Sequence, residues 1–441
     1  MVKITFIGAG STVFAKNVLG DALMTPALQG CRIALYDIDP QRLADSHRMV
    51  ELLNENVGGG KAVVESYLGV ENRKEALRGA DFVVNAIQVG GYEPATVADF
   101  EIPKRYGIRQ TIGDTLGIGG IFRGLRTLPV LEDVAAEMEE VCPRAWLLNY
   151  SNPMAILTGF MQRYTKVHTV GLCHSVQVCA PHLLKGMGIE AKLPLQQKIA
   201  GINHMAWLLE LKDADGVDLL PEVRRRAIAE LEKMPHSDCK DLVRLEYIRR
   251  LGYYCTESSE HNAEYNPWFI KPRYPELIDR YNIPLDEYPR RCIKHEEQWA
   301  QRRLQFVSGD ITHQRSNEYA SRIMEAIVTD IPYRFGGNVL NTGLIENLPG
   351  NACVEVPCVA SAAGIEAVKV GALPEVCAAM NRTNINSQLL TIQAHVQRSK
   401  DVVYQAALLE PRVAQELSID DTIAMCDELL EAHKAFLPEY K

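Results

Sequence analysis

The chain has 441 residues, of which 47 are basic and 56 acidic, and its formal net charge is −9. This balance argues against nucleic acid or an anionic membrane as a partner, because binding either one needs a basic face. No run of 18 apolar residues predicts a spanning helix, and the opening sequence MVKITFIGAGST lacks the features of a signal peptide. Eleven cysteines without paired spacing indicate reduced thiols and a cytoplasmic protein.

The first half of the chain alternates short apolar runs with segments of helical periodicity. The apolar runs have the composition of buried parallel strands and cover Lys3–Ile7, Arg32–Tyr36, Asp81–Ile87, Ala145–Asn149 and Val167–Leu172. Helical spacing lies between them, over Lys16–Met24, Gln41–Leu53 and Leu125–Met138. This alternation predicts an α/β fold, with a Rossmann-like doubly wound parallel sheet over residues 1–190.

The second half, residues 191–441, has a mixed pattern that predicts an α+β lobe packed closely on the first. A strand, or a turn leading into one, is expected over Gly201–Leu211, and another strand over Ala352–Ala360, with Pro357 at a sheet edge or a bulge. The expected helices are Leu219–Glu232, Glu318–Thr329, Pro411–Leu417 and Asp421–Ala435. No Gly/Ser-rich linker separates the lobes, so the cleft between them is the expected site.

A nucleotide-binding loop is predicted directly after the first strand. Gly8 permits a tight turn, and Gly10 lets the backbone approach a pyrophosphate at the helix N-terminus, beside Ser11 and Thr12. The third glycine of the usual fingerprint is absent. Asp37 follows the second strand, where an acid binds the ribose hydroxyls of NAD and disfavours NADP. The alternative is an ordinary strand-to-helix turn capped by Ser11.

A thiol and an imidazole follow apolar runs of the same predicted sheet. Cys173 lies just past a core strand, in the sequence Val170–Ser175, and His204 follows 31 positions later. The carboxyl ends of such strands face the ligand crevice. Two ligands are too few for a closed structural zinc site but suit an open site that substrate and water complete. The alternative is a buried cysteine and a core histidine without a metal.

Three carboxylates, an imidazole and a phenol are concentrated in one short segment. These side chains are Glu257, Glu260, His261, Glu264 and Tyr265. If the segment is helical, Glu257 and His261 share one face of the helix. Glu260 and Glu264 then share another. Such a cluster can shift pKa values and supply a general base, whereas the alternative, a solvated helix end, is ordinarily the more common explanation.

Two glycine- or amide-rich segments also follow predicted strands or precede helices. Ile112–Arg123 is dense in glycine and contains one acid, Asp114, which is typical of a mobile lid or a turn. Asn149–Pro153 ends a core strand with two amides, Asn149 and Asn152, and is interpreted as a substrate clamp or a turn.

Taken in order, these segments resemble glycoside hydrolase family 4, the NAD- and metal-dependent glycosidases. The resemblance spans essentially the whole chain and is carried by KITFIGAGST, ALYDID, QVGGYEP, NYSNPM, GLCHS, GINHMAW and ESSEHNAEY. It is strongest for the α-galactosidase (melibiase) branch, where Cys-His-Ser follows the strand. Branches acting on 6-phosphosugars typically carry Cys-Asp there, so the presence of His174 argues against a phosphorylated substrate. Branches acting on α-galacturonides and α-glucuronides share much of the pattern.

The resemblance implies hydrolysis of α-galactosides such as melibiose by an oxidation–elimination route rather than by the paired carboxylates of most glycosidases. NAD would take a hydride from C3 of the sugar and later return it, and a divalent metal such as Mn²⁺, held by Cys173 and His204, would polarise the ketone. A base would remove the C2 proton so that the glycosidic oxygen leaves.

The resemblance also implies roles for individual residues. The base would come from Glu260, His261 or Tyr265, which stay unranked. Asp114 is the expected acid for the leaving group. Asn152 and His174 are the expected substrate-binding residues. The family further implies a homodimer or homotetramer.

Two readings of a different class remain beside the glycosidase. An NAD-dependent hydroxy-acid dehydrogenase would use the same sheet and consume its cofactor stoichiometrically. A nucleotide-sensing binding protein would show no turnover. Dehydrogenases of this kind usually need no metal, and a sensor has no use for the pair Cys173 and His204 at the crevice, so both are less favoured.

Overall fold

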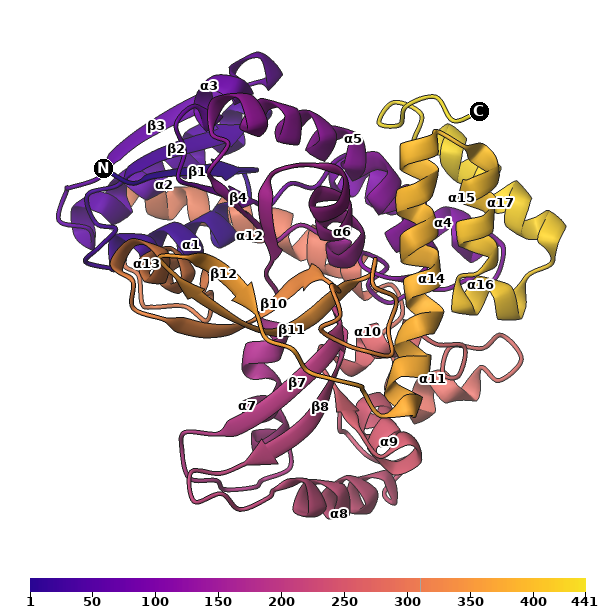
Figure 1. Ribbon diagram of the computed structural model, residues 1–441. Coiled ribbons are helices and arrows are strands. Elements are labelled where there is room, and N and C mark those ends of the chain that lie inside the picture. Colours follow the sequence, from indigo (N-terminus) through magenta and orange to yellow (C-terminus); the bar gives the residue numbers. More distant parts are fainter. Residues whose placement is uncertain (310) are drawn as a thin grey trace.

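One continuous twisted sheet organises the chain (Figure 1). In the computed structural model, which describes residues 1–309 and 311–441, the strand order is β3-β2-β1-β4-β5-β6-β10-β11-β7-β8-β9, and β12 pairs with β11. The strands from β3 to β6 pair in parallel, in the order of a Rossmann sheet. From β10 onward the pairing is antiparallel.

The parallel half of the sheet confirms the predicted doubly wound architecture. Its strands are β1 (Lys3–Ile7), β2 (Arg32–Asp37), β3 (Val63–Leu68), β4 (Phe82–Asn85), β5 (Trp146–Asn149) and β6 (His168–Gly171). Its helices are α1 (Thr12–Leu23), α2 (Pro40–Asn56), α3 (Arg73–Leu77), α4 (Val97–Arg105), α5 (Gly117–Val141), α6 (Met154–Tyr164) and α7 (Ser175–Gly186), with short turns η1 (Val70–Asn72) and η2 (Gly91–Thr96). Strands such as β1 and β4 are buried along their whole length because helices cover the sheet.

Two features of this half differ from the sequence-based expectation. Strand β3 was not predicted, because it lies at the sheet edge, is partly exposed and has no continuous apolar run. The expected lid over Ile112–Arg123 is wrong from Gly117 onward, where the chain forms the first turns of α5. Glycine is needed there for close packing, since a Cβ atom on Gly120 would lie 2.8 Å from the Thr115 carbonyl oxygen.

The second half contributes antiparallel strands and helices that surround them. Its strands are β7 (Gln196–Ile202), β8 (Met205–Lys212), β9 (Tyr254–Cys255), β10 (Tyr333–Leu340), β11 (Cys353–Ser361) and β12 (Gly364–Ala367). Its helices are α8 (Leu220–Leu231), α9 (Leu242–Leu251), α10 (Ser259–Glu264), α11 (Glu276–Arg280), α12 (Glu287–Ser308), α13 (Ala320–Thr329), α14 (Glu375–Gln397), α15 (Lys400–Leu408), α16 (Pro411–Glu416) and α17 (Ile419–Ala432). The predicted strands and helices of this half are all present, which confirms the mixed α+β lobe.

The position of Pro357 is a correction. Strand β11 is interior to the sheet rather than an edge strand, and its register with β10 continues through Pro357 without a bulge. On the other side of β11, the pairing with β7 occurs at Glu355 and the pairing with β12 begins at Cys358. Proline is therefore tolerated at the point where β11 changes partner, because no described strand pairs with it on that side.

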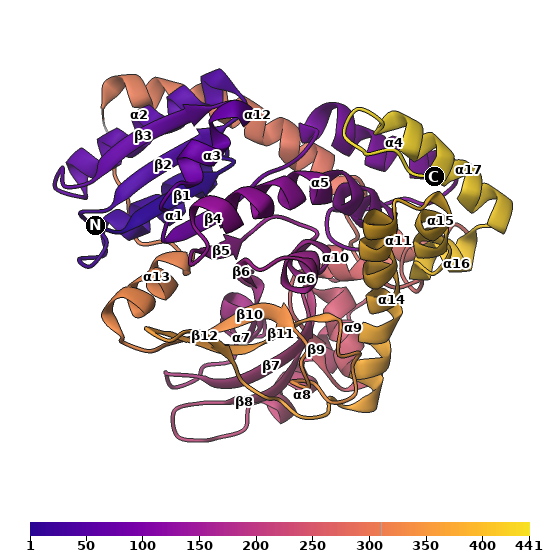
Figure 2. The same ribbon diagram turned by 45° about the horizontal axis from the view of Figure 1, so that its top comes forward.

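Helices α14 to α17 pack beside α4 and α5, at the end of the molecule away from β1–β3 (Figures 1 and 2). A buried ionic group joins these segments. Both oxygens of Asp99 in α4 accept hydrogen bonds from the Arg126 guanidinium of α5, at 3.0 and 2.6 Å. His433, directly after α17, lies 2.8 Å from Asp99 Oδ1. All three side chains are at most 2 % exposed, so each depends on the others to compensate its burial.

The structure also shows the state of the cysteines and the character of the helices. All eleven cysteines are free thiols, nine of them buried, as their spacing predicts. Among the described helices, none combines the length and apolarity needed to cross a membrane.

Removing the carboxylate from this ionic group should destabilise the fold strongly. We expect Asp99→Ala to lower the free energy of unfolding by about 3–5 kcal/mol, because it leaves the buried Arg126 guanidinium without a counter-charge. Glu428 of α17 offers a matched control, since it pairs with Arg105 of α4 in the same helical region but at the surface. Urea unfolding followed by circular dichroism should show a far smaller loss for Glu428→Ala. Equal losses would contradict this account of the helical end.

Candidate active site

The loop after β1 has the shape that a nucleotide pyrophosphate requires. Gly8 adopts a left-handed conformation with φ +84°, and its amide and that of Ala9 both donate to the Tyr36 carbonyl at 3.0 Å. A Cβ atom on Gly8 would lie 2.7 Å from the Ala86 carbonyl oxygen, so only glycine fits at this turn. The Gly10 amide donates to Asp37 Oδ2 at 2.6 Å. The acid predicted to bind a ribose therefore lies against the loop predicted to bind the pyrophosphate.

The remaining two predicted loop residues open helix α1. Ser11 is exposed, its amide donates to the Gly8 carbonyl at 3.1 Å, and its side chain makes no capping hydrogen bond. The backbone of Thr12 begins α1, while its side chain lies outside the described part of the structure. The first turn of α1 contains no acidic residue, so the positive end of the helix dipole is available to an anion.

A second group of side chains meets near the carboxyl end of strand β6. Cys173 follows β6, His204 lies in the turn between β7 and β8, and Glu257 lies between β9 and α10. One potential ligand atom from each of them lies within 4.8 Å of the other two. Among the described residues, this is the one such group of three metal-binding side chains. We call it the Cys–His–Glu cluster.

Hydrogen bonds hold each member of the cluster in place. The Tyr319 hydroxyl accepts from the Cys173 amide at 2.9 Å and lies 3.1 Å from its carbonyl oxygen, while Cys173 Sγ is 3.1 Å from the Ser175 hydroxyl. His204 Nδ1 is 3.0 Å from the Tyr265 hydroxyl, and His204 Nε2 is 3.5 Å from the Glu257 carboxylate. The backbone of His204 has φ +63°, an uncommon conformation that needs such anchors.

Burial and nearby charges set the protonation of the three cluster side chains, and a metal ion would displace the proton of the Cys173 thiol. Burial, together with the nearby Glu355 and Glu257 carboxylates, raises the pKa of the Cys173 thiol well above its usual value. Burial lowers the pKa of His204 to about 4, which keeps the imidazole neutral and able to bind a metal. Burial opposes ionisation of Glu257, but the facing imidazoles of His204, His261 and His174, with Arg244, hold its pKa at about 2. A thiol, a neutral imidazole and a carboxylate are thus presented together.

Glu257 was not among the metal ligands predicted from sequence. It belongs to the acid-rich segment, where it was considered only for acid–base chemistry. Its own φ of +67° turns it away from α10, which begins at Ser259. A local turn of this kind leaves no periodic signal, so only the three-dimensional arrangement identifies Glu257 as the third member.

The three candidates for the base have different surroundings. The Tyr265 side chain is fully buried and contacts His204 through its hydroxyl. The His261 ring packs edge-on against the ring of His204, with 5.0 Å between centroids, and its Nδ1 lies 2.7 Å from the Ser258 hydroxyl. Glu260 instead forms an ion pair with Arg291 of α12. His261 and Tyr265 therefore border the Cys–His–Glu cluster, whereas the Glu260 carboxylate is occupied elsewhere.

The predicted acid Asp114 lies on a loop that a buried carboxylate organises. The side chain of Glu264, 2 % exposed, accepts hydrogen bonds from the backbone amides of Thr111 at 2.7 Å and Gly113 at 2.8 Å. Asp114 follows directly and accepts from the Thr115 hydroxyl at 2.9 Å. Sequence reasoning gave Glu264 no such role, because its partners are backbone amides about 150 positions away.

The predicted substrate-binding residues lie at the ends of neighbouring strands. Asn152 follows β5; its Oδ1 accepts from the Met154 amide at 3.2 Å, and its carbonyl accepts from Arg123 Nε at 3.2 Å. His174 directly follows Cys173 and is exposed. Arg123, buried and close enough to Asp114 for their charges to interact, was not predicted; its place inside a glycine-dense segment concealed it.

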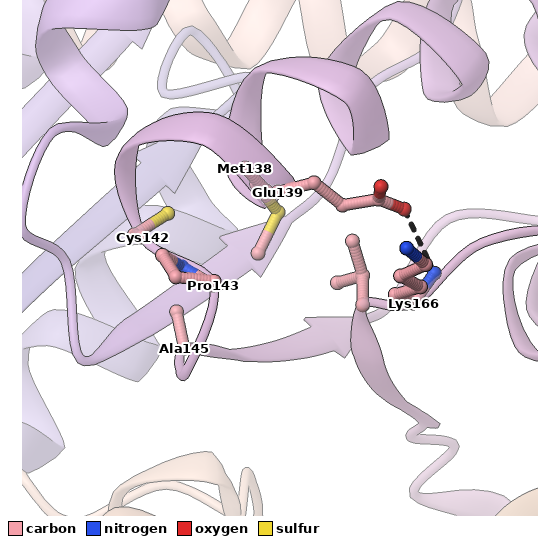
Figure 3. Close-up of a pocket in the computed structure, with 7 residues that line it drawn as sticks. Met138, Glu139, Cys142, Pro143, Ala145 and Lys166 are labelled. Atoms are coloured by element: carbon pink, nitrogen blue, oxygen red, sulfur yellow. Dashed lines mark hydrogen bonds between the residues drawn. The ribbon is translucent and has the colours of Figure 1, made fainter.

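A separate hollow lies near the amino ends of strands β5 and β6, away from the Cys–His–Glu cluster. Its lining lacks the metal-binding side chains of that cluster. Its lining includes Met138, Glu139 and Cys142 near the end of α5, and Lys166 ahead of β6 (Figure 3). The Lys166 amide donates to the Glu139 carboxylate at 2.8 Å. Burial raises the pKa of Cys142 to about 11, which leaves its thiol unreactive.

The fold is of the Rossmann type, with a glycine turn after β1 and the Cys–His–Glu cluster beyond the end of β6. Residues 3–189 match the family 4 glycosyl hydrolases, and residues 199–413 match the family 4 glycosyl hydrolase C-terminal domain. The chain belongs to this family. It is 60% identical to an alpha-galactosidase of Bacillus subtilis over 442 residues, which cover 100% of both chains.

A second relative and one solved structure are also similar to this chain. An alpha-galactosidase of Rhizobium meliloti is 33% identical over 99% of this chain and 89% of its own length. The structure of a 6-phospho-beta glucosidase from Thermotoga maritima, solved with manganese, NAD+ and glucose-6-phosphate, superposes with a TM-score of 0.79. That similarity covers 99% of this chain and 100% of the other at 20% identity, and it shows the shared fold.

Loss of the thiol should abolish tight metal binding without unfolding the chain. We expect Cys173→Ser to weaken Mn²⁺ binding on the order of 100-fold or more, since changing even residues behind metal ligands costs 10–100-fold. Isothermal titration with Mn²⁺ measures the affinity, and far-ultraviolet circular dichroism monitors the fold. Cys179→Ser, in the buried face of α7, is the matched control and should bind Mn²⁺ normally. Full metal occupancy in Cys173→Ser would remove Cys173 from the site.

Proposed function

We propose that this protein is an α-galactosidase that cleaves α-galactosides such as melibiose and uses NAD and a divalent metal, Mn²⁺ by preference. The observation that carries the proposal is the Cys–His–Glu cluster at the same sheet edge as the Gly8–Asp37 nucleotide loop. A glycosidase that works by paired carboxylates needs neither feature. The 60% identity to an alpha-galactosidase over the full chain supports the choice of substrate.

The loop after β1 fits NAD. The close approach of Gly8 to the backbone of Ala86 leaves no room for a side chain, and the first turn of α1 can receive a phosphate. Asp37 would exchange its bond to the Gly10 amide for the ribose diol, and its charge would repel the 2′-phosphate of NADP. Gly8, Gly10, Ser11, Thr12 and Asp37 are thus proposed to hold the cofactor.

The Cys–His–Glu cluster fits a divalent metal of borderline softness. Cys173 and His204 supply sulfur and nitrogen, and Glu257 adds an oxygen donor. Three protein ligands leave positions open for the hydroxyl oxygens of a sugar. We therefore add Glu257 to the two ligands predicted from sequence.

The chemistry follows from the groups around the cluster. When bound, NAD supplies reversible hydride transfer at C3 and the metal stabilises negative charge on the adjoining oxygen. Tyr265, whose hydroxyl contacts His204, is proposed to remove the C2 proton, with His261 as the second candidate. Asp114, on the loop that the Glu264 carboxylate organises, is proposed to protonate the departing glycosidic oxygen.

The remaining assignments concern the substrate and the assembly. Asn152 and His174 are proposed to contact sugar hydroxyls, since they follow the neighbouring strands β5 and β6. We further propose a division into a cofactor lobe, 1–190, and a substrate and metal lobe, 191–441, with the site at their interface, since the first supplies Cys173 and the second His204 and Glu257. The proposed assembly is a cytoplasmic homodimer or homotetramer.

The isotope content of the product tests the proposed route. Hydrolysis of nitrophenyl α-galactoside in D₂O should require both NAD and Mn²⁺ and should leave deuterium at C2 of the released galactose, because the route breaks the C2–H bond. Mass spectrometry and NMR of the sugar after a long incubation measure this. No solvent deuterium at C2 of the galactose, together with normal turnover rates for substrates deuterated at C2 or C3, would contradict the route.

The same assay separates the alternatives. Faster turnover of the nitrophenyl α-galacturonide or α-glucuronide would make this chain a uronidase of the same family. Stoichiometric conversion of NAD to NADH would identify a dehydrogenase, and NAD binding without turnover would identify a sensor.

The role of Asp37 gives a separate prediction about the cofactor. We expect Asp37→Ala to weaken NAD binding by about 1.5–3 kcal/mol, roughly 10- to 100-fold, because a charged hydrogen-bond acceptor is lost. Discrimination against NADP should fall as well. Titration of both cofactors measures the effect, and Asp81→Ala, which removes an acceptor for the Lys3 amide at the other edge of the sheet, is the control. Unchanged NAD affinity would place the adenosine elsewhere.

A further inference from the structure

The strands that carry the two metal ligands predicted from sequence are not neighbours. Cys173 follows β6 and His204 follows β7, and strands β10 and β11 lie between them. Two of the strand pairings between these ligands are short. Strand β6 pairs with β10 only at Gly171–Asn338, and β7 pairs with β11 only at Gly201–Glu355. The backbone ladder alone therefore constrains the distance between the ligands weakly.

Polar side chains cross the sheet at these same two register positions. Asn338 Nδ2 donates to Glu355 Oε1 at 2.9 Å and to the Gly171 carbonyl at 3.4 Å. Both side chains are essentially inaccessible, at 0 and 1 % exposure. The absence of a side chain at Gly171 permits this arrangement, since a Cβ atom there would lie 2.8 Å from Asn338 Cβ.

Asn203 extends this polar row to the second ligand, because it directly precedes His204 and is fully buried. Its amide is close enough to Glu355 to lower the pKa of that carboxyl, although burial dominates and raises the value to about 8. In the described structure, Asn203 Nδ2 and Oδ1 and Glu355 Oε2 are buried and have no hydrogen-bond partner within the distance and angle of a formed bond. Buried polar atoms are costly when unpaired, so Asn203 and Glu355 Oε2 are each other's natural partners.

We propose that Asn338, Glu355 and Asn203 form a positioning bridge that holds Cys173 and His204 at the separation a metal ion requires. The bridge runs from the carbonyl of Gly171, two residues before Cys173, to the residue before His204. It rests on the metal site of the proposed function and gives that site a supporting layer. None of the three side chains belongs to the Cys–His–Glu cluster; they act through the backbone segments that carry its members.

The chemistry of the bridge explains why the sheet interior tolerates a carboxyl group there. A neutral carboxyl both donates and accepts, so it can join two amides in a directional row, which an apolar side chain cannot do. His204 has an uncommon left-handed backbone conformation and benefits from a fixed neighbour on its amino side. Glutamine reproduces the donor and the acceptor of a neutral carboxyl at nearly the same size.

Metal affinity of the full-length protein tests the bridge, with isothermal titration of Mn²⁺ as the readout. Asn338→Ala and Glu355→Leu should bind Mn²⁺ about 10- to 100-fold more weakly, the range found for residues that support metal ligands. Glu355→Gln should restore affinity close to that of the unmodified protein. Asn341 supplies a matched control, because it follows the same strand, is equally buried and holds only the nearby 345–349 loop.

The outcomes separate positioning from general stability. Asn341→Ala should lower the melting temperature but leave Mn²⁺ affinity unchanged. Equal affinity losses in Asn338→Ala and Asn341→Ala would overturn the bridge, as would normal affinity in Glu355→Leu or a loss in Glu355→Gln equal to that in Glu355→Leu. Should Asn338→Ala not fold, the two Glu355 variants, which fill the same volume, decide the matter. Failure of the unmodified protein to bind Mn²⁺ would instead refute the proposed function and remove the bridge's purpose with it.

Discussion

The convergence of Cys173, His204 and Glu257 at one edge of the sheet is the constraint on which the site depends. The three come from separate parts of the second and third quarters of the chain, yet one ligand atom of each lies within 4.8 Å of the others. Bringing a carboxylate, a thiol and an imidazole together in a buried place is unfavourable by itself, because each ionised form loses hydration. Their surroundings are accordingly rich in fixed partners, such as Tyr319 for the Cys173 backbone and Tyr265 for His204.

The sheet connects this cluster to the nucleotide loop as one continuous set of strands, and the buried side chains of Asn338 and Glu355 reinforce it where the backbone pairing is narrow. Two strands of its parallel half, β1 and β2, lead to the Gly8 loop and to Asp37. The antiparallel half continues from β6 through β10 and β11 to β7 and the turn that carries His204. A hydride transferred between cofactor and sugar requires the two to be held at a fixed distance. A single sheet satisfies that requirement better than two lobes joined by a linker, and it accounts for the absence of a Gly/Ser-rich segment in the sequence.

Sequence patterns predict the parts of this arrangement that local chemistry determines. The strand Lys3–Ile7 was located to the residue because it is apolar throughout and ends at a glycine turn, and Cys173 and His204 stand out because each follows an apolar run. Glu257 and Glu264 could not be assigned in this way. Glu257 faces His204 in the distant β7–β8 turn, and the partners of Glu264 are backbone amides near Thr111, so neither leaves a periodic trace. Edge strand β3 and the glycine-rich start of α5 were missed or misread because partial exposure and close helix packing imitate loops.

Anomalous diffraction at the manganese edge, from crystals grown with Mn²⁺ and NAD, tests the central claim most directly. One strong peak is expected, bounded by Cys173 Sγ, a His204 ring nitrogen and a Glu257 carboxylate oxygen. A peak bound elsewhere, or one at the cluster with Cys173 or Glu257 turned away from the ion, would contradict that claim.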